Sequence, residues 1–128
     1  MTANQFRRIA LGHQDAAEGA HMGHPDFRVG GRIFATLRED NVHGMVTIPP
    51  EQQARLVREH PSVFNPENGA WGRAGSTRVV LEAADEEVLG EAMTLAWRWA
   101  VAKGPTKARN RESGTSTQKP GARRPRKS

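Results

Sequence analysis

The chain has 128 residues, no cysteine and a formal net charge of +5 at pH 7. A chain of this length forms at most one domain with a single small core, and the lack of cysteine excludes disulfides, thiolate zinc sites and cysteine nucleophiles. No stretch approaches the ~18 apolar residues of a membrane-spanning helix, and the apolar run after Arg7 and Arg8 is too short for an export signal. We therefore expect a soluble cytoplasmic protein that makes no membrane contact.

The positive charge is concentrated at the C-terminal end. Residues 103–128 carry nine Lys or Arg and one acid, a net charge of +8, which leaves a net charge of −3 in residues 1–102. Residues 104–128 have almost no apolar side chains, so they cannot bury enough surface to offset the entropy of ordering. We predict a folded domain over residues 1–103 and a disordered basic tail over residues 104–128, which either binds a polyanion or keeps the protein soluble.

The chain begins with a predicted helix. Thr2 and Gln5 have the spacing of a capping box, and Gly12 ends the helix near Leu11. The apolar residues that share one face of this helix are Phe6, Ile9 and Ala10. Residues 17–21 then predict a first strand.

A tandem glycine at residues 30 and 31 predicts a β-hairpin between strands near residues 27–29 and 32–37. A two-residue loop pairs Val29 with Arg32. A three-residue loop that includes Arg32 pairs Val29 with Ile33, and the apolar residues it gathers on one face are Phe27, Val29, Ile33, Ala35 and Leu37. We favour the second register because its buried face is cleaner. In both registers Arg28 lies on a strand and Arg32 at or beside the tip.

Residues 43–48 predict a fourth strand, whose apolar positions are Val42, Val46 and Ile48. A second helix begins at residues 49–51, where proline is tolerated in the first turn, and ends before Pro61. Its expected buried residues are Ala54, Leu56 and Val57. Residues 62–75 predict a loop packed on the core by Val63, Phe64 and Trp71.

The last two elements are a strand over residues 76–81 and a long helix. Val79 and Leu81 share one face of the strand, and Arg78 and Val80 the other. Asp85 is a good N-cap for the helix, and residues 103–105 (Lys-Gly-Pro) form its stop signal. The helical apolar stripe is Leu89, Ala92, Met93, Ala96 and Ala100. The order helix, about four strands, helix, one or two strands and C-terminal helix predicts an α+β fold with an antiparallel sheet.

Four stretches resemble the MmcQ/YjbR family: HMGHPDFRVGGRIFATL (21–37), PEQQA (50–54), GAWGR (69–73) and AWR (96–98). They occur in the family's order and spacing, so the resemblance covers roughly residues 6–102. It implies a compact α+β domain of the CyaY-like type, described as a double wing. It also implies DNA binding, the label that this family usually carries through its likeness in shape to such wings.

Two histidines and a carboxylate, His21, His24 and Asp26, could ligate zinc. Their spacing places both histidines on one face only in a helix, which Gly23 and Pro25 disfavour. We therefore expect the histidines to point to different faces of an extended segment and to bond to the backbone. No nucleophile, base and orienting residue recur at a recognisable spacing, and the tandem glycine lacks the Lys-Ser or Lys-Thr of a phosphate loop. The sequence predicts no catalytic, metal or cofactor site.

The candidate DNA contacts are basic side chains, because guanidinium groups suit phosphate and guanine alike. They are Arg28, Arg32, Arg73 and Arg78 in the domain and Arg123, Arg124, Arg126 and Lys127 in the tail. The alternative for each domain arginine is a solvated sheet edge that blocks unwanted strand pairing. Trp71 and Trp97 are expected in the core rather than as platforms for base stacking.

Our hypothesis is a non-enzymatic, largely non-specific DNA-binding protein, in which the domain orients the contact and the tail supplies most of the affinity. The alternative is a small-molecule or protein-binding module with a solubilising tail. A concave, apolar-lined pocket next to His24 and Trp71 would favour the module, whereas a convex hairpin face carrying arginines would favour DNA.

Overall fold

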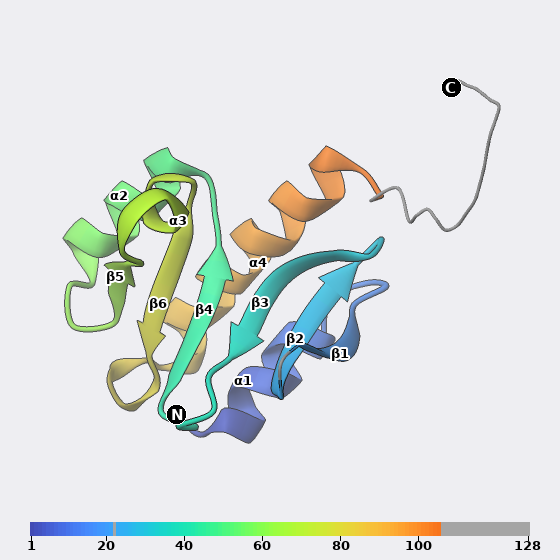
Figure 1. Cartoon of the computed structure of the whole chain (residues 1–128). Helices are drawn as coiled ribbons and strands as arrows, with labels where there is room; N and C mark the ends of the chain where they lie inside the picture. The colour runs from blue at the N-terminus through green and yellow to red at the C-terminus, as the bar shows by residue number, and fades with distance from the viewer. Residues whose placement is uncertain (22, 106–128) are drawn as a thin grey trace, which may run out of the picture.

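The computed structural model describes residues 1–21 and 23–105. Its centre is a six-stranded antiparallel sheet in the order β1-β2-β3-β4-β6-β5, with helices packed on it (Figure 1). This confirms the predicted α+β class. The strands are β1 (Ala17–His21), β2 (His24–Val29), β3 (Arg32–Leu37), β4 (His43–Thr47), β5 (Phe64–Pro66) and β6 (Ser76–Val80). The helices are α1 (Ala3–Leu11), α2 (Pro50–Glu59), α3 (Gly69–Arg73), the 3₁₀ turn η1 (Leu81–Ala83) and α4 (Glu86–Lys103).

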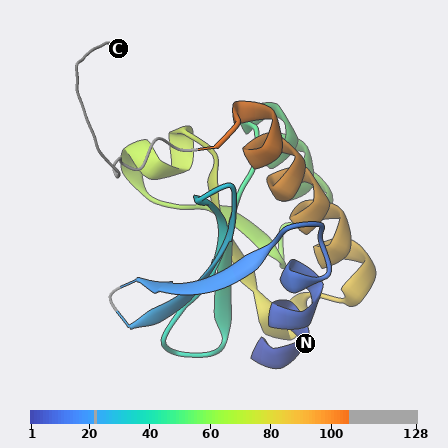
Figure 2. The same ribbon diagram turned by 90° about the vertical axis from the view of Figure 1, so that its right-hand side faces the viewer.

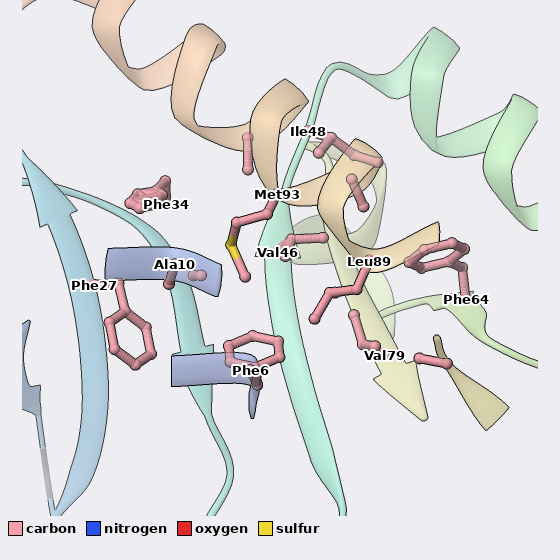
Figure 3. Packing of buried hydrophobic residues seen from close by; sticks show 14 of the residues in the cluster. Phe6, Ala10, Phe27, Phe34, Val46, Ile48, Phe64, Val79, Leu89 and Met93 are labelled. Carbon is pink, nitrogen blue, oxygen red and sulfur yellow. The ribbon is translucent and has the colours of Figure 1, made fainter. Parts of the chain in front are cut away.

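The sheet separates two layers. Figure 2 shows α1 (dark blue) and α4 (orange) on one side of the sheet and α3 (yellow-green) on the other. The hydrophobic core lies between the sheet and α1 and α4 (Figure 3), and its buried side chains include Phe6, Phe27, Val46, Val79 and Met93. We call the other face, beside which α3 lies, the open face. In the described part of the chain, no helix is both long and apolar enough to cross a membrane.

The two terminal helices agree with the signals in their sequences. The hydroxyl of Thr2 accepts a hydrogen bond from the Gln5 backbone, and the Gln5 side chain accepts one from the Thr2 backbone, so the capping box is formed. The carboxylate of Asp85 caps α4 by accepting from the backbone of Val88 at 2.8 Å. The predicted buried stripe of α4 is also confirmed residue by residue.

The tip of the β2–β3 hairpin differs from the register we favoured. Val29 pairs with Arg32, so the loop has two residues instead of three. Gly30 and Gly31 have φ of 60° and 78°, the left-handed values that both central residues of a type I′ turn require. Such a turn matches the right-handed twist of the flanking strands, which is why the shorter loop is adopted here.

A β-bulge below the tip changes the pairing again. Phe27 faces Ala35, as the three-residue loop would have placed it, because Phe34 is an extra residue in β3. Phe34 and Ala35 are therefore both buried, whereas Ile33, which we expected in the core, is only partly buried. The sequence predicted the right strands but not the bulge that brings a second phenylalanine into the core.

Three other expectations about burial are wrong. Ala54 of α2 is exposed, and the polar Gln53 takes its place in the buried stripe. Trp71, expected in the core, has 76% of its surface exposed, and Val42 has 51%. The segment expected to be a loop over residues 62–75 contains β5 and α3, although its Val63 and Phe64 are buried as predicted. The predicted tail from residue 106 onward lies outside the described residues.

Candidate functional site

A row of side chains crosses the open face from β2 to β5. Its members pair in register from strand to strand and are Asp26, Thr36, Met45, Arg78 and Asn65. Successive side chains of a strand point to opposite faces, and the sequence neighbours Phe27, Val46 and Val79 lie in the core. The row therefore points away from α1 and α4, toward the side on which α3 lies.

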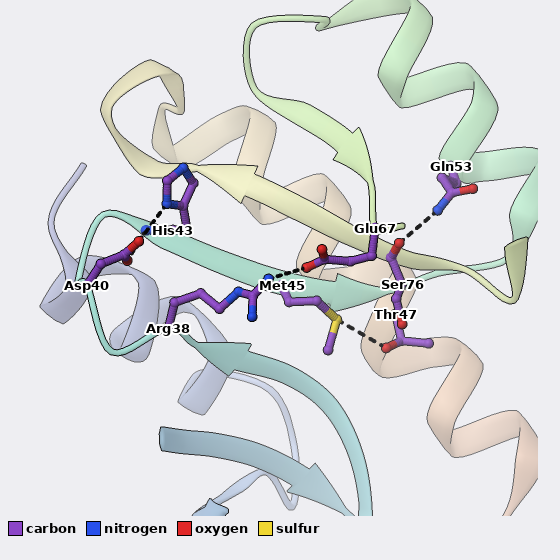
Figure 4. A network of polar contacts seen from close by, with 8 residues as sticks. All are labelled: Arg38, Asp40, His43, Met45, Thr47, Gln53, Glu67 and Ser76. Carbon is purple, nitrogen blue, oxygen red and sulfur yellow. Dashed lines mark hydrogen bonds and ion pairs between the residues drawn. The ribbon is translucent and has the colours of Figure 1, made fainter. Parts of the chain in front are cut away.

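An ion pair bridges the open face. Nη2 of Arg38 lies 3.0 Å from Oε2 of Glu67. Arg38 follows β3 and Glu67 follows β5, so the pair spans the two strands between them, β4 and β6 (Figure 4). Because the Arg38 side chain is 45% exposed, this pair contributes less than about 1 kcal/mol to stability. Its main effect is to fix where the guanidinium lies.

Two hollows adjoin at Arg38, each with a volume of about 360 Å³. We call the first the Trp71 hollow, and its lining residues are Thr36, Arg38, Met45, Glu67, Asn68, Trp71 and Ser76. We call the second the Arg78 hollow, and its lining residues are His24, Arg38, Glu39, Asp40, His43 and Arg78. The open face is thus concave on both sides of the Arg38–Glu67 ion pair, with an aromatic wall on one side and a mixture of basic and acidic groups on the other.

Helix α3, which carries Trp71, is anchored from the far side of the sheet. The buried side-chain amide of Gln53 in α2 donates to the carbonyl of Gly72 at 3.0 Å, to the carbonyl of Ser76 at 3.1 Å and to the hydroxyl of Thr77 at 3.0 Å. These contacts join α2 to both ends of the α3–β6 connection. Gln53 therefore determines where Trp71 stands above the sheet, although its own side chain is not at the surface.

The Arg78 hollow contains a hydrogen-bonded pair formed by His43 and Asp40. Nδ1 of His43 lies 2.8 Å from Oδ2 of Asp40. This hydrogen bond, helped by the backbone N–H groups of Val42 and His43, lowers the pKa of Asp40 to about 2. Nδ1 of His24 is buried and has no hydrogen-bond partner among the described residues. Among the described residues, no other buried side-chain nitrogen or oxygen lacks a hydrogen-bond partner.

The two predicted hairpin arginines lie on opposite faces of the sheet. Arg28 is on the open face, where its Nε and Nη2 donate to the two carboxylate oxygens of the fully buried Asp26 at 2.8 and 2.9 Å. This hydrogen bonding raises the pKa of Arg28. Arg32 lies on the helix side, where its Nε donates to the carbonyl of Gly104 at 3.2 Å, at the end of α4. The structure therefore does not bring Arg28 and Arg32 together into one contact surface.

The other two predicted domain arginines, Arg73 and Arg78, both lie on the side of the sheet that carries α3. Arg73 is exposed at the end of α3, two residues after Trp71, and Arg78 stands in the row across the open face. The predicted tail contacts Arg123, Arg124, Arg126 and Lys127 lie outside the described residues. Whether any of these side chains binds DNA stays a prediction.

The histidine segment also differs from the expected extended strand. His21 and His24 are paired residues at the facing ends of β1 and β2, and not positions along one strand. Among the described residues, no group of three or more His, Cys, Asp or Glu side chains is arranged to hold a metal ion.

Sequence reasoning missed the residues that build the Trp71 hollow. Arg38 falls between two predicted strands and was given no role, and Glu67 and Asn68 fall in the loop expected over residues 62–75. No local pattern connects them, because they meet only when β3 and the β5–α3 connection are placed across the sheet from each other. The available signal was Trp71 itself, a large aromatic side chain flanked by glycines in a short polar segment.

Comparisons with known proteins bear on the fold and the family. The crystal structure of Deinococcus radiodurans protein DR2400, a protein with a DUF419 domain, is similar with a TM-score of 0.69 and 22% sequence identity, over 87% of this chain and 86% of that one. At this identity the likeness concerns the fold. No curated protein matches. The family model YjbR matches residues 11–99. That match spans most of the chain and confirms the resemblance inferred from the sequence, so the chain belongs to the YjbR family.

Proposed function

We propose that this protein is a non-enzymatic DNA-binding protein whose domain orients the contact and whose basic segment supplies most of the affinity. The observation that carries the proposal is the division of charge, +8 in residues 103–128 against −3 in residues 1–102. Lys and Arg that neutralise phosphates release condensed counterions, which gives affinity without sequence preference. Residues 103–128 are therefore the strongly cationic part of the protein, and we assign most of the phosphate contacts to them.

The charges of the domain favour the open face as the side turned toward DNA. Five exposed acidic residues, Glu82, Asp85, Glu86, Glu87 and Glu91, lie on η1, the N-cap of α4 and the first turns of α4. Their negative potential repels phosphate from the helix layer. Arg73 and Arg78 lie on the other side, where neither forms an ion pair with another described residue.

The test compares the full chain with a chain that ends at Pro105, which keeps the core and the Gly104 carbonyl that accepts from Arg32. Duplex DNA is titrated in ~50 mM salt, where phosphate contacts contribute most. We expect the shorter chain to bind at least ~100-fold more weakly. Equal affinities would show that the basic segment does not supply the binding.

The role of the open face is tested in the shorter chain. Replacing Arg73 and Arg78 with Gln is expected to lower its residual DNA affinity, and Arg98→Gln, an exposed arginine on α4, serves as the matched control. If the shorter chain does not bind DNA with Arg28, Arg32, Arg73 and Arg78 all intact, the domain arginines have no part in the function.

A second candidate function is a binding module for a small molecule or a protein, with the basic segment acting only in solubility. The concave Trp71 hollow favours it, because exposed aromatic side chains beside a few polar groups are typical of ligand sites. This candidate would be selected if the full chain fails to bind DNA in low salt, while a planar ligand changes the tryptophan fluorescence of the wild-type protein but not of Trp71→Phe.

A further inference from the structure

We propose that the open face holds an unpaired nucleotide, with its base stacked on Trp71 and its phosphate beside Arg78, so that the protein prefers single-stranded to duplex nucleic acid. This inference rests on the proposed function and names the form of nucleic acid that the domain itself recognises. It is carried by the geometry of the two hollows and the ion pair between them.

Trp71 has the surroundings of a stacking platform. Its side chain is 76% exposed and forms one wall of the Trp71 hollow, and Met45 lies in the same lining. Every nucleobase presents a flat π-face, so an exposed indole binds bases without regard to sequence. The hollow, at about 360 Å³, lies within the range of small-ligand sites and is large enough for one such group.

Polar side chains in the same hollow are available to a base edge. Thr36, Asn68 and Ser76 line it, and none of these three side chains makes a hydrogen bond to another described residue. A hydroxyl both donates and accepts, and an amide does both with separate atoms. The hollow therefore offers hydrogen bonds to any of the bases, in keeping with a site that binds without strong sequence preference.

Arg78, in the Arg78 hollow, supplies a guanidinium group for a neighbouring phosphate. Arg78 pairs with Met45 across adjacent strands, which lie about 4.8 Å apart, so it is one strand away from the floor of the Trp71 hollow. Arg38 lines both hollows and His24, with its unpartnered Nδ1, lines this one. The carboxylates of Glu39 and Asp40 lie in the same lining and offset the formal charges of Arg38 and Arg78, so the phosphate contact depends on Arg78, which makes no ion pair with another described residue.

Single strands fit this arrangement better than a duplex. In a duplex the faces of the bases are covered by stacking, and a base must leave the helix before an indole can reach it. In a single strand the bases can splay outward while the phosphates follow a basic groove. The exposed indole of Trp71 beside a concave face is therefore suited to unpaired nucleotides.

The basic segment can act on the same strand. The described chain ends at Pro105, which packs against Gly30 at the tip of the β2–β3 hairpin. Residues 106–128 contain eight Lys or Arg and one acid. In this proposal these charges add phosphate contacts along the same strand.

The experiment uses the full chain and its Trp71→Ala, Trp71→Phe and Val101→Ala variants, with a labelled oligothymidylate of ~12 nucleotides and a duplex of equal length as probes. Binding is measured by fluorescence anisotropy at one fixed salt concentration. We expect Trp71→Ala to weaken binding to the single strand by roughly 5- to 100-fold, the range of one lost stacking contact. Duplex binding should stay within about twofold, since it depends on phosphate contacts. Trp71→Phe should retain most of the affinity, and Val101→Ala, an exposed apolar residue on α4, should retain all of it.

Arg78→Gln provides an independent readout. It should reduce the slope of log affinity against log salt for the single strand by about 0.7, the value for one phosphate contact. Equal single-strand affinity of the wild-type and Trp71→Ala proteins would overturn the inference while leaving the proposed function in place. Failure of the wild-type full chain to bind either probe would instead overturn the proposed function.

Discussion

Replacing Gln53 with Met tests whether one buried amide anchors the surface that carries Trp71. Methionine has nearly the same length and volume, so the change removes the hydrogen bonds without opening a cavity. The wild-type amide nitrogen contacts three acceptors but has only two protons, so it provides about two full hydrogen bonds.

The expected loss follows from what the acceptors retain. The Gly72 carbonyl also accepts from the backbone of Gly75, and the Ser76 carbonyl from the backbone of Glu67. Neither is left without a partner, so the full penalty for a buried unsatisfied group does not apply. Two lost bonds at about 1 kcal/mol each predict a decrease of about 2 kcal/mol in the free energy of unfolding, or roughly 8–16 °C in Tm for a domain of this size.

Chemical denaturation followed by circular dichroism measures this loss, and Gln52→Met is the matched control. Gln52 sits one position earlier on α2 and bonds only to Arg55 at the surface, so its replacement should cost less than about 0.5 kcal/mol. A loss below ~0.5 kcal/mol for Gln53→Met would show that α3 is held by other contacts, and the reasoning about this amide would be refuted.

Two further predictions concern the rim of the open face. Gly72→Ala should lower the free energy of unfolding by about 1–3 kcal/mol, because the added Cβ would meet the Glu67 carbonyl oxygen and the backbone must shift. This cost outweighs the gain of less than ~1 kcal/mol in helix propensity. Denaturant titration measures the loss, and an unchanged midpoint would contradict the prediction. The carboxyl of Asp40 should titrate with a pKa of about 2 by NMR, and His43→Ala should raise that pKa part of the way to the ordinary value. Because the folded pKa is lowered, the contribution of Asp40 to stability is present above about pH 4 and is lost as the pH falls toward 2. A carboxyl pKa that does not change in His43→Ala would show that the backbone N–H groups alone lower it.

Local signals were enough for the elements whose ends are fixed by their own residues. The capping box of Thr2 and Gln5 and the N-cap Asp85 define helix starts without reference to the rest of the fold. The apolar stripe of α4 was also readable, because small and apolar residues recur there at helical spacing on a face that a sheet covers.

The errors arose where distant residues decide the outcome. Gln53 is buried because its acceptors come from α3 and β6, about 20 residues later in the chain. The sequence of α2 alone gives no reason to expect a glutamine in the buried stripe. Phe34 enters the core through a bulge, which no alternation pattern of a single strand reveals.

The candidate site could be predicted only in part. Arg78 was expected on the outer face of its strand, and it lies there. Trp71 was assigned to the core because large aromatic side chains are usually buried, yet the short helix α3 turns it outward. Arg28 and Arg32 were both predicted to contact DNA, but the two-residue turn places them on opposite faces of the hairpin.

The most direct test of the account is the salt dependence of single-strand binding for the full chain and for the chain ending at Pro105. The account predicts that removing eight Lys or Arg lowers the slope of log affinity against log salt by several units, up to about 6, since each phosphate contact on a single strand contributes about 0.7. It also predicts that the shorter chain keeps a weak affinity that Trp71→Ala abolishes. Equal slopes for the two chains would contradict the central claim that the basic segment supplies the phosphate contacts.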